Sequence, residues 1–257
     1  MHRRPRSGPR PLAHLGLSYR SPPRLARLPL SSYPGDVTTL RDEPRLIAQE
    51  RGLWVLHKPS GYAVHRTGDE SIPDLQRWAR AALDAPETLS PIHRLDRDTS
   101  GVVLFAADAK MLSEGGSWFA EGLVKKRYVA LVHGRARKKG IIRRPLQDSR
   151  RGRRLPAVTR YRCLALYGAC SYLGVRPETG RQHQIRKHLT GLGHPIVGDT
   201  RYRAKRVRSV PGFPGRLWLH AGVIEVPGGQ RYESPLPPEL VAHLELLKQA
   251  QDVDAQS

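Results

Sequence analysis

The chain has 257 residues, which is enough for one large domain or two small ones. Hydrophobic residues make up 39% and aromatic residues 6%, the balance of a globular protein with a modest core, and no continuous apolar stretch is long enough to span a bilayer. The 44 Lys and Arg residues outnumber 23 Asp and Glu residues, giving a net charge of +21. This excess indicates a polyanionic partner, with nucleic acid ahead of an anionic membrane surface.

The N-terminal segment differs in composition from the remainder. Residues 1–35 contain seven arginines, seven prolines and no acidic residue, which predicts a disordered basic tail. A transit peptide is the alternative, although the prolines disfavour its amphipathic helix. We therefore expect a tail over residues 1–45, a folded domain over 46–250 and a flexible C-terminus over 251–257. The two cysteines, Cys163 and Cys170, fit neither a disulfide framework nor a zinc ribbon and are interpreted as free thiols.

The hydrophobic pattern then predicts several strands and few helices in chain order. Strands are expected at 53–57, in a short run after the Pro-Ser-Gly turn, and at 101–106, 127–132, 157–166, 171–176 and 217–226. Helices are expected at 71–83, 109–123, 181–192 and after Pro238. This order favours an α+β fold with a largely antiparallel or mixed sheet.

A strongly basic segment runs from Lys125 to Arg162, with 15 Lys and Arg residues against the single acidic residue Asp148. Its centre lacks a long apolar pattern and is interpreted as a hairpin or an exposed loop. A run of charge is usually only a solvated face, but this local excess favours contact with an RNA or DNA backbone.

Two clusters of charged residues are candidates for chemistry. The first, "HRLDRDTS" at 93–100, directly precedes an apolar run, so it is anchored to the sheet, whereas a surface turn is the simpler alternative. In the second, Ile185 and Leu189 lie on one face of the expected helix, and Arg181, four residues before Ile185, is expected at its buried edge. A buried arginine requires an anion, and we expect Asp96 to be that partner.

A metal site is disfavoured in this second cluster. His183 and His188 are five residues apart, unlike the pair four apart in zinc proteases, and His194 restores no familiar spacing. We expect neither a metal nor any other cofactor.

Five motifs in order resemble one known family. "HRLDRDTSGVVLFA" is similar to the catalytic block of the RluA-like pseudouridine synthases, and "LHKPSGYAVH" to the hairpin before it. "VKKRYVALVHG", "TGRQHQIRKHLTGLGHPIVGDTRY" and "RLWLHAGVIEVP" with "YESPLPPEL" resemble the later blocks, so that the resemblance covers about residues 46–247. It implies the pseudouridine synthase fold, a bent sheet with a few flanking helices and a central cleft. His57 and Arg203 depart from the pattern, and no S4-like module is expected before the domain.

The resemblance implies conversion of uridine in folded RNA to pseudouridine. Asp96 would be the essential carboxylate, either attacking the sugar carbon or removing a sugar proton, and Arg181 would keep it ionised. Tyr128 would stack on the uracil or transfer a proton, with a plain core tyrosine as the alternative.

The same resemblance suggests residues that bind the RNA and the base. Arg94 would fill the space left by the everted base, with a surface pair to Asp98 as its alternative. His93 would support the site by a hydrogen bond, and Ile185 would pack beneath the base. The remaining expected contacts to RNA or to the floor of the site come from Lys58, Lys126 and Arg127.

The expected partner is RNA, either an rRNA or a tRNA stem-loop, and the protein is expected to be a cytoplasmic monomer with no membrane association. The lack of an extra RNA-binding module slightly favours a compact target such as tRNA. Two rival functions remain at this point: an RNA-binding protein without catalysis, and a metal-dependent nuclease, which would require clustered acids that this sequence scatters among arginines.

Overall fold

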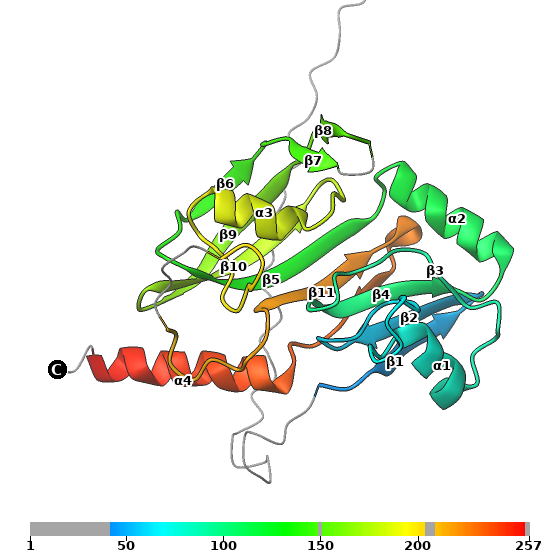
Figure 1. Cartoon of the computed structure of the whole chain (residues 1–257), viewed down its shortest axis with the longest axis horizontal. Coiled ribbons are helices and arrows are strands. Elements are labelled where there is room, and N and C mark those ends of the chain that lie inside the picture. Colours follow the sequence, from blue (N-terminus) through cyan, green and yellow to red (C-terminus); the bar gives the residue numbers. More distant parts are fainter. Residues whose placement is uncertain (1–41, 149–150, 204–208, 255–257) are drawn as a thin grey trace, which may run out of the picture. The chain divides into compact units, whose positions relative to one another are not determined.

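The computed structural model describes residues 42–148, 151–203 and 209–254 (Figure 1). The expected basic tail lies almost wholly outside the described residues, as do positions 255–257. Within the described part of the chain, no helix has the length and apolar character needed to cross a membrane.

A ten-stranded sheet forms the framework. Its main path is β1 (Arg45–Glu50), β2 (Leu53–Lys58), β4 (Ser100–Ala106), β11 (Leu219–Glu225), β5 (Lys125–His133), β10 (Cys170–Pro177), β9 (Thr159–Tyr167) and β6 (Lys139–Ile142). The short strands β3 (Ser90–Pro91) and β12 (Arg231–Glu233) pair with β4 and β11, and a 3-10 turn (Pro227–Gly229) precedes β12. Among these described strands, only β4 and β11 pair in parallel, so the predicted mixed sheet is confirmed.

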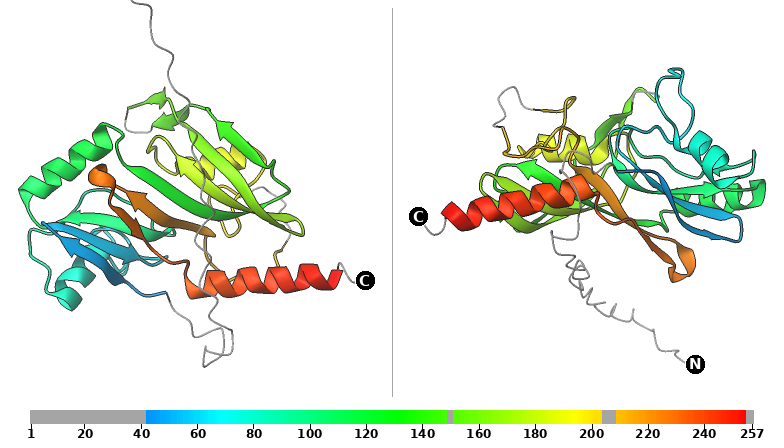
Figure 2. Two further views of the ribbon diagram at one scale, coloured as in Figure 1. Left: turned by 180° about the vertical axis from the view of Figure 1, so that it is seen from behind. Right: turned by 90° about the horizontal axis from the view of Figure 1, so that it is seen from below.

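Four α-helices flank the sheet: α1 (Leu75–Leu83), α2 (Ala109–Ala120), α3 (Gln184–Gly191) and α4 (Pro238–Asp254). Side chains of the preceding residues begin the first two helices, because Asp74 accepts a hydrogen bond from the backbone N–H of Arg77 and Asp108 from that of Met111. Figure 2 shows α1 and α2 beside the β1–β2–β4 part of the sheet, and α3 beside the part that contains β9 and β10.

Strands β2 and β4 are buried on both faces. Trp54 and Leu56 pack in a cluster with α1, whereas Leu53 and Val55 pack in a cluster with Met111 of α2. Because neighbouring residues of a strand point to opposite faces, both faces of these strands are covered, which explains their uninterrupted apolar sequences. A third cluster is built from β5, β10, α3 and α4.

Several expected boundaries require correction. The short run after the Pro-Ser-Gly turn forms only an isolated bridge between Ala63 and Asp74. The helix expected at 181–192 begins at Gln184, and α4 continues to Asp254, so it includes part of the C-terminus that we expected to be flexible. The centre of the basic segment, by contrast, contains β6 and a separate hairpin of β7 (Leu146–Asp148) and β8 (Arg153–Leu155), in agreement with the first of the two interpretations given to it.

The start of β4 is fixed tightly against β11. Gly101 has a φ of 128°, and a Cβ atom at this position would lie 2.2 Å from the carbonyl oxygen of Ala221. Only glycine permits this backbone conformation and this approach. The loop of residues 92–99 ends directly before β4. It is therefore held at a defined place beside the centre of the sheet.

Candidate active site

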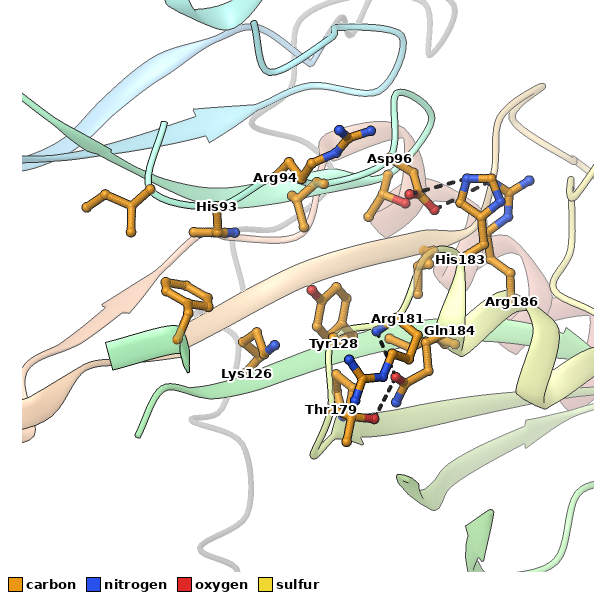
Figure 3. A pocket seen from close by; sticks show the side chains of 18 residues that line it. His93, Arg94, Asp96, Lys126, Tyr128, Thr179, Arg181, His183, Gln184 and Arg186 are labelled. Atoms are coloured by element: carbon orange, nitrogen blue, oxygen red, sulfur yellow. Dashed lines mark hydrogen bonds and ion pairs between the residues drawn. The ribbon is translucent and has the colours of Figure 1, made fainter. Parts of the chain in front are cut away.

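A cavity of about 270 Å³ opens beside the loop of residues 92–99 (Figure 3). We call it the base pocket. The loop forms one wall, strand β5 and the end of α2 form another, and the turn between β10 and α3 closes it. The lining residues are Ile92, His93, Arg94, Leu95, Asp96, Thr99, Phe119, Lys126, Tyr128, Pro177, Thr179, Gly180, Arg181, His183, Gln184, Ile185, Arg186 and Leu219. Asp96 is the only carboxylate in this set.

Asp96 lies beside two side chains from the start of α3, His183 and Arg186. Its Oδ1 is 3.5 Å from Nε2 of His183, and its Oδ2 is 3.6 Å from Nη1 of Arg186. The Asp96 side chain is 27% exposed, so the carboxylate remains open to the pocket. Figure 3 shows both neighbours on the same side of the carboxylate.

Arg186 joins Asp96 to a second, fully buried carboxylate. Its Nε and Nη2 each donate a 2.8 Å hydrogen bond to Asp199, whose side chain is 0% exposed. Burial acts to raise the pKa of Asp199, but the hydrogen bonds and charge of Arg186, with two backbone N–H donors, hold it below its usual value. The guanidinium is thereby locked in one orientation and presents its remaining edge to Asp96.

The expected pairing of Asp96 with Arg181 is wrong. Arg181 does line the base pocket, but its Nε donates to the carbonyl of Pro156 at 3.1 Å. The helical projection that placed it at a buried edge does not apply, because α3 begins at Gln184 and His183 has a left-handed φ of 53°. The side chain of Gln184 instead holds this turn by accepting from the backbone N–H of Arg181 at 3.0 Å.

Strand β5 presents alternate side chains to the base pocket. Lys126 and Tyr128 face it, and the ammonium of Lys126 lies 5.7 Å from the ring centre of Phe119. Burial and the nearby charge of Asp96 raise the pKa of Tyr128 well above its usual value, so its hydroxyl stays protonated at neutral pH. The residue between them points elsewhere: Arg127 does not line the pocket and forms a 2.6 Å ion pair with Glu225.

The loop supplies the other expected pocket residues. Nε2 of His93 accepts from the backbone N–H of Leu104 at 3.1 Å, and its ring stacks on Phe119 with centres 4.8 Å apart. Burial lowers the pKa of His93 to about 3, so the ring is neutral. Arg94 is exposed at the pocket and has no carboxylate partner among the described residues, whereas Asp98 pairs with Arg97. Ile185 lines the pocket and is 6% exposed.

Lys58 does not line the base pocket, but it contacts the backbone of the loop that carries Asp96. It is completely buried, and its ammonium donates three 2.8 Å hydrogen bonds to the carbonyls of Pro59, Tyr62 and Arg97. Burial, followed by the charge of Arg216, lowers its pKa to about 7. Its place is beneath the loop that carries Asp96, where it holds the loop through the Arg97 carbonyl.

The sequence interpretation missed the roles of His183, Arg186 and Tyr202. Nδ1 of His183 shares a 2.8 Å hydrogen bond with the Tyr202 hydroxyl. The rings of these two residues also contact each other in a T-shaped arrangement. His183 was considered only as a metal ligand. The available signal for Arg186 was its position beside Ile185 on a helix whose apolar stripe faces the sheet.

Three comparisons with known proteins agree. A model of the RNA pseudouridylate synthase family matches residues 52–190. An uncharacterized RNA pseudouridine synthase of Zymomonas mobilis is 36% identical over 209 residues, which cover 75% of this chain and 94% of that relative. A tRNA pseudouridine synthase C of Haemophilus ducreyi is 34% identical over 203 residues, covering 70% of this chain and 83% of the relative.

Two further matches extend the comparison to rRNA enzymes and to solved structures. A ribosomal large subunit pseudouridine synthase C of Vibrio parahaemolyticus is 34% identical over 195 residues, 71% of this chain and 61% of that relative. The structure of human RNA pseudouridylate synthase domain containing 4 superposes with a TM-score of 0.67 at 25% identity, covering 79% of this chain and 92% of that one. Five ordered motifs, the fold and these matches lead to one conclusion: the chain belongs to the RNA pseudouridylate synthase family, as an isomerase of the RluA-like group.

Proposed function

We propose that this isomerase uses Asp96 to convert a specific uridine of a folded rRNA or tRNA to pseudouridine. One observation carries the proposal: the single carboxylate of the base pocket is held by His183 and Arg186 and faces an aromatic and apolar slot. Such a slot suits a pyrimidine ring, and the carboxylate at its edge suits the sugar to which that ring is attached.

The reaction breaks the bond between C1′ and N1 of the uridine and forms a bond between C1′ and C5. The proton on C5 leaves, and N1 gains one, so the product has the same atoms as the substrate. Asp96 either attacks C1′ or removes a proton from the sugar, and both routes need an ionised, accessible carboxylate. Arg186 supports both, because it balances this charge and fixes its direction.

The uracil is held in the base pocket by packing. Tyr128 offers its ring face and Ile185 an apolar surface. Burial raises the pKa of the Tyr128 hydroxyl, so in the resting site this residue offers its ring for stacking and a hydroxyl that can donate a hydrogen bond. The target base must leave its helix at a cost of a few kcal/mol. Arg94, an exposed lining residue with no carboxylate partner in the described part of the chain, is suited to occupy the vacated space.

The RNA around the target binds the basic segment. This segment meets the pocket at two places: β5 lines the base pocket, and Pro156, directly after β8, accepts the hydrogen bond from Arg181. The arginines of β8, Arg153 and Arg154, are exposed. Relatives that modify tRNA and relatives that modify large-subunit rRNA are similar in identity, so both substrate classes belong in the test.

Replacing Asp96 with asparagine tests the proposal. Pseudouridines are mapped in rRNA and tRNA from cells that carry the wild-type gene, the Asp96→Asn variant or no gene. We expect one or a few sites to vanish without the gene and to stay absent with Asp96→Asn, while RNA affinity is retained. Asp84→Asn is the matched control, since Asp84 is exposed at the end of α1 in a left-handed conformation that asparagine tolerates. A full set of pseudouridines in the Asp96→Asn cells would refute the role of Asp96.

A further inference from the structure

A second hollow, of about 370 Å³, adjoins the base pocket at Asp96. It shares five lining residues with the base pocket, namely Arg94, Leu95, Asp96, His183 and Arg186. The carboxylate and its two neighbours from α3 therefore form a partition between the two cavities. A molecule that spans this partition has its middle at Asp96 and one end in each cavity.

The two cavities differ in chemistry. The base pocket has aromatic and apolar walls that include Phe119, Tyr128 and Ile185. The second hollow adds arginines and hydroxyl groups from exposed loops, among them Arg201, Thr67 and Thr200. The carboxylates Asp96 and Asp98 also line this hollow, so its donors for an anion are the arginines that these carboxylates leave unpaired.

Two arginines that line this hollow have no carboxylate partner among the described residues. Among the described residues, neither Arg94 nor Arg201 forms an ion pair, whereas Arg97 pairs with Asp98 at 3.3 Å. The guanidinium of Arg201 lies 5.7 Å from the ring centre of Tyr202. An arginine stacked on an aromatic ring and without a carboxylate partner is well suited to a phosphate group.

The backbone around Arg201 is hydrogen-bonded to the same buried carboxylate that holds Arg186 in the partition. Asp199 accepts hydrogen bonds from the backbone N–H groups of Arg201 at 2.9 Å and Tyr202 at 2.8 Å, while it also binds Arg186. The hydroxyl of Tyr202 in turn contacts His183. One buried carboxylate therefore fixes both Arg186, beside Asp96, and the backbone of Arg201, so the spacing between the two cavities is built into the fold.

We propose that the second hollow binds the sugar-phosphate backbone of the RNA next to the target nucleotide, with Arg201 as its main phosphate contact. This inference rests on the proposed function, since it takes the base pocket to hold the uracil. In a nucleotide the ribose lies between base and phosphates. With the base in its pocket and the ribose at Asp96, the adjoining phosphodiester lies across the partition, among the unpaired arginines.

The test measures binding of a fluorescent heptauridylate to the full chain and to Arg201→Ala, between about 50 and about 200 mM salt. We expect Arg201→Ala to weaken binding about fivefold at low salt and to reduce the slope of log affinity against log salt by about 0.7, the loss of one phosphate contact on a single strand. Arg201→Lys should retain most of the affinity. The matched control is Arg231→Ala, which removes a partly exposed arginine of β12 that lines neither cavity.

Measurements of RNA affinity test this inference, whereas pseudouridine formation tests the proposed function on which it rests. Equal affinities and slopes for the wild type, Arg201→Ala and Arg231→Ala would overturn the inference, even if the enzyme makes pseudouridine normally. Failure of the wild type to change any uridine would refute the proposed function, while the heptauridylate result would still decide whether the hollow binds phosphate. On an RNA that is a substrate, Arg201→Ala should raise KM and leave kcat within about twofold.

Discussion

At the scale of single residues, Arg186 is the arginine on which Asp96 depends. It is 4% exposed and bridges Asp96 to the buried Asp199. We expect Arg186→Gln to abolish isomerisation and to lower the free energy of unfolding by about 3–5 kcal/mol, because it leaves Asp199 buried and uncompensated. Arg186→Lys keeps the charge and loses the two-point contact, so it should recover part of the stability but little kcat. Urea unfolding measures the free energy of unfolding of each variant, and single-turnover kinetics measure its rate of isomerisation.

The contrasting change is Arg181→Gln. Arg181 is bonded to a backbone carbonyl at the pocket rim, so we expect its loss to raise KM severalfold while kcat and the urea midpoint remain close to wild type. The opposite ranking, with Arg181→Gln inactive and Arg186→Gln active, would contradict the geometry described here.

The two arginines also show what the sequence could and could not predict about the site. The motif resemblance identified Asp96 and Tyr128, and both line one cavity. The choice of Arg181 followed from extending a helix three residues too far, across a left-handed His183 that periodicity cannot reveal. Contacts made through such a turn depend on backbone angles, and these are settled by the tertiary fold.

At the scale of elements, the loop of residues 92–99 is held by the turn after β2. Lys58 donates to the Arg97 carbonyl, the backbone N–H of Gly61 donates to the same oxygen at 2.9 Å, and the Ser60 hydroxyl donates to the Asp98 carbonyl at 2.8 Å. Two segments nearly forty residues apart are thereby joined directly beneath Asp96.

Replacing Lys58 with methionine should release this loop. Three carbonyls lose the ammonium as a donor, and only that of Arg97 keeps a second donor in Gly61, so we expect Lys58→Met to lower the free energy of unfolding by about 2–4 kcal/mol and kcat by more than about tenfold, with RNA affinity nearly unchanged. Lys110→Met, at an exposed position of α2, is the control and should change neither. Urea unfolding at pH 6.5 and pseudouridine formation provide the readouts. Lost RNA affinity with normal kcat would instead place Lys58 on the RNA-binding surface.

Elements with strong local signals were predicted well. The apolar runs of β2 and β4 depend mainly on neighbouring residues, and these strands agree closely with those expected. Helices α1 and α2 lie within the expected ranges, although α1 begins four residues later and α2 ends three residues earlier than predicted. The sequence predicted only a hairpin or an exposed loop for the region of β6, β7 and β8 and did not locate the individual strands. The pairing of β6 with β9 and of β7 with β8 comes from tertiary contacts and not from an alternating apolar pattern.

At the scale of the whole molecule, buried histidines make the fold sensitive to acid. Burial lowers the pKa of the described histidines His57, His93, His133, His183, His188, His220 and His243, and for His93 and His220 the value is about 3. His220 shows why: its Nδ1 lies 2.9 Å from the Ser100 hydroxyl, and its Nε2 lies 2.9 Å from the Ser234 carbonyl oxygen. A neutral ring satisfies both neighbours.

The sign of the effect follows from these lowered values. An unfolded chain binds protons at its histidines below about pH 6.5, whereas the folded chain resists protonation at His93 and His220 down to about pH 3. Stability is therefore fully present above pH 6.5 and is lost as the pH falls. At pH 4.5 these two residues alone should cost about 5 kcal/mol, at about 1.4 kcal/mol per pH unit each.

Urea unfolding at intervals from pH 7.5 to 4.5 measures this loss. We expect a flat profile down to about pH 6.5 and then a steep decline. His220→Asn keeps a donor and an acceptor but cannot titrate, so it should be less stable at pH 7.5 and should decline with a slope shallower by about 1.4 kcal/mol per pH unit. A wild-type free energy of unfolding that stays constant to pH 4.5 would mean that these rings are protonated in the folded protein, and the neutral contacts assigned to His220 would then be wrong.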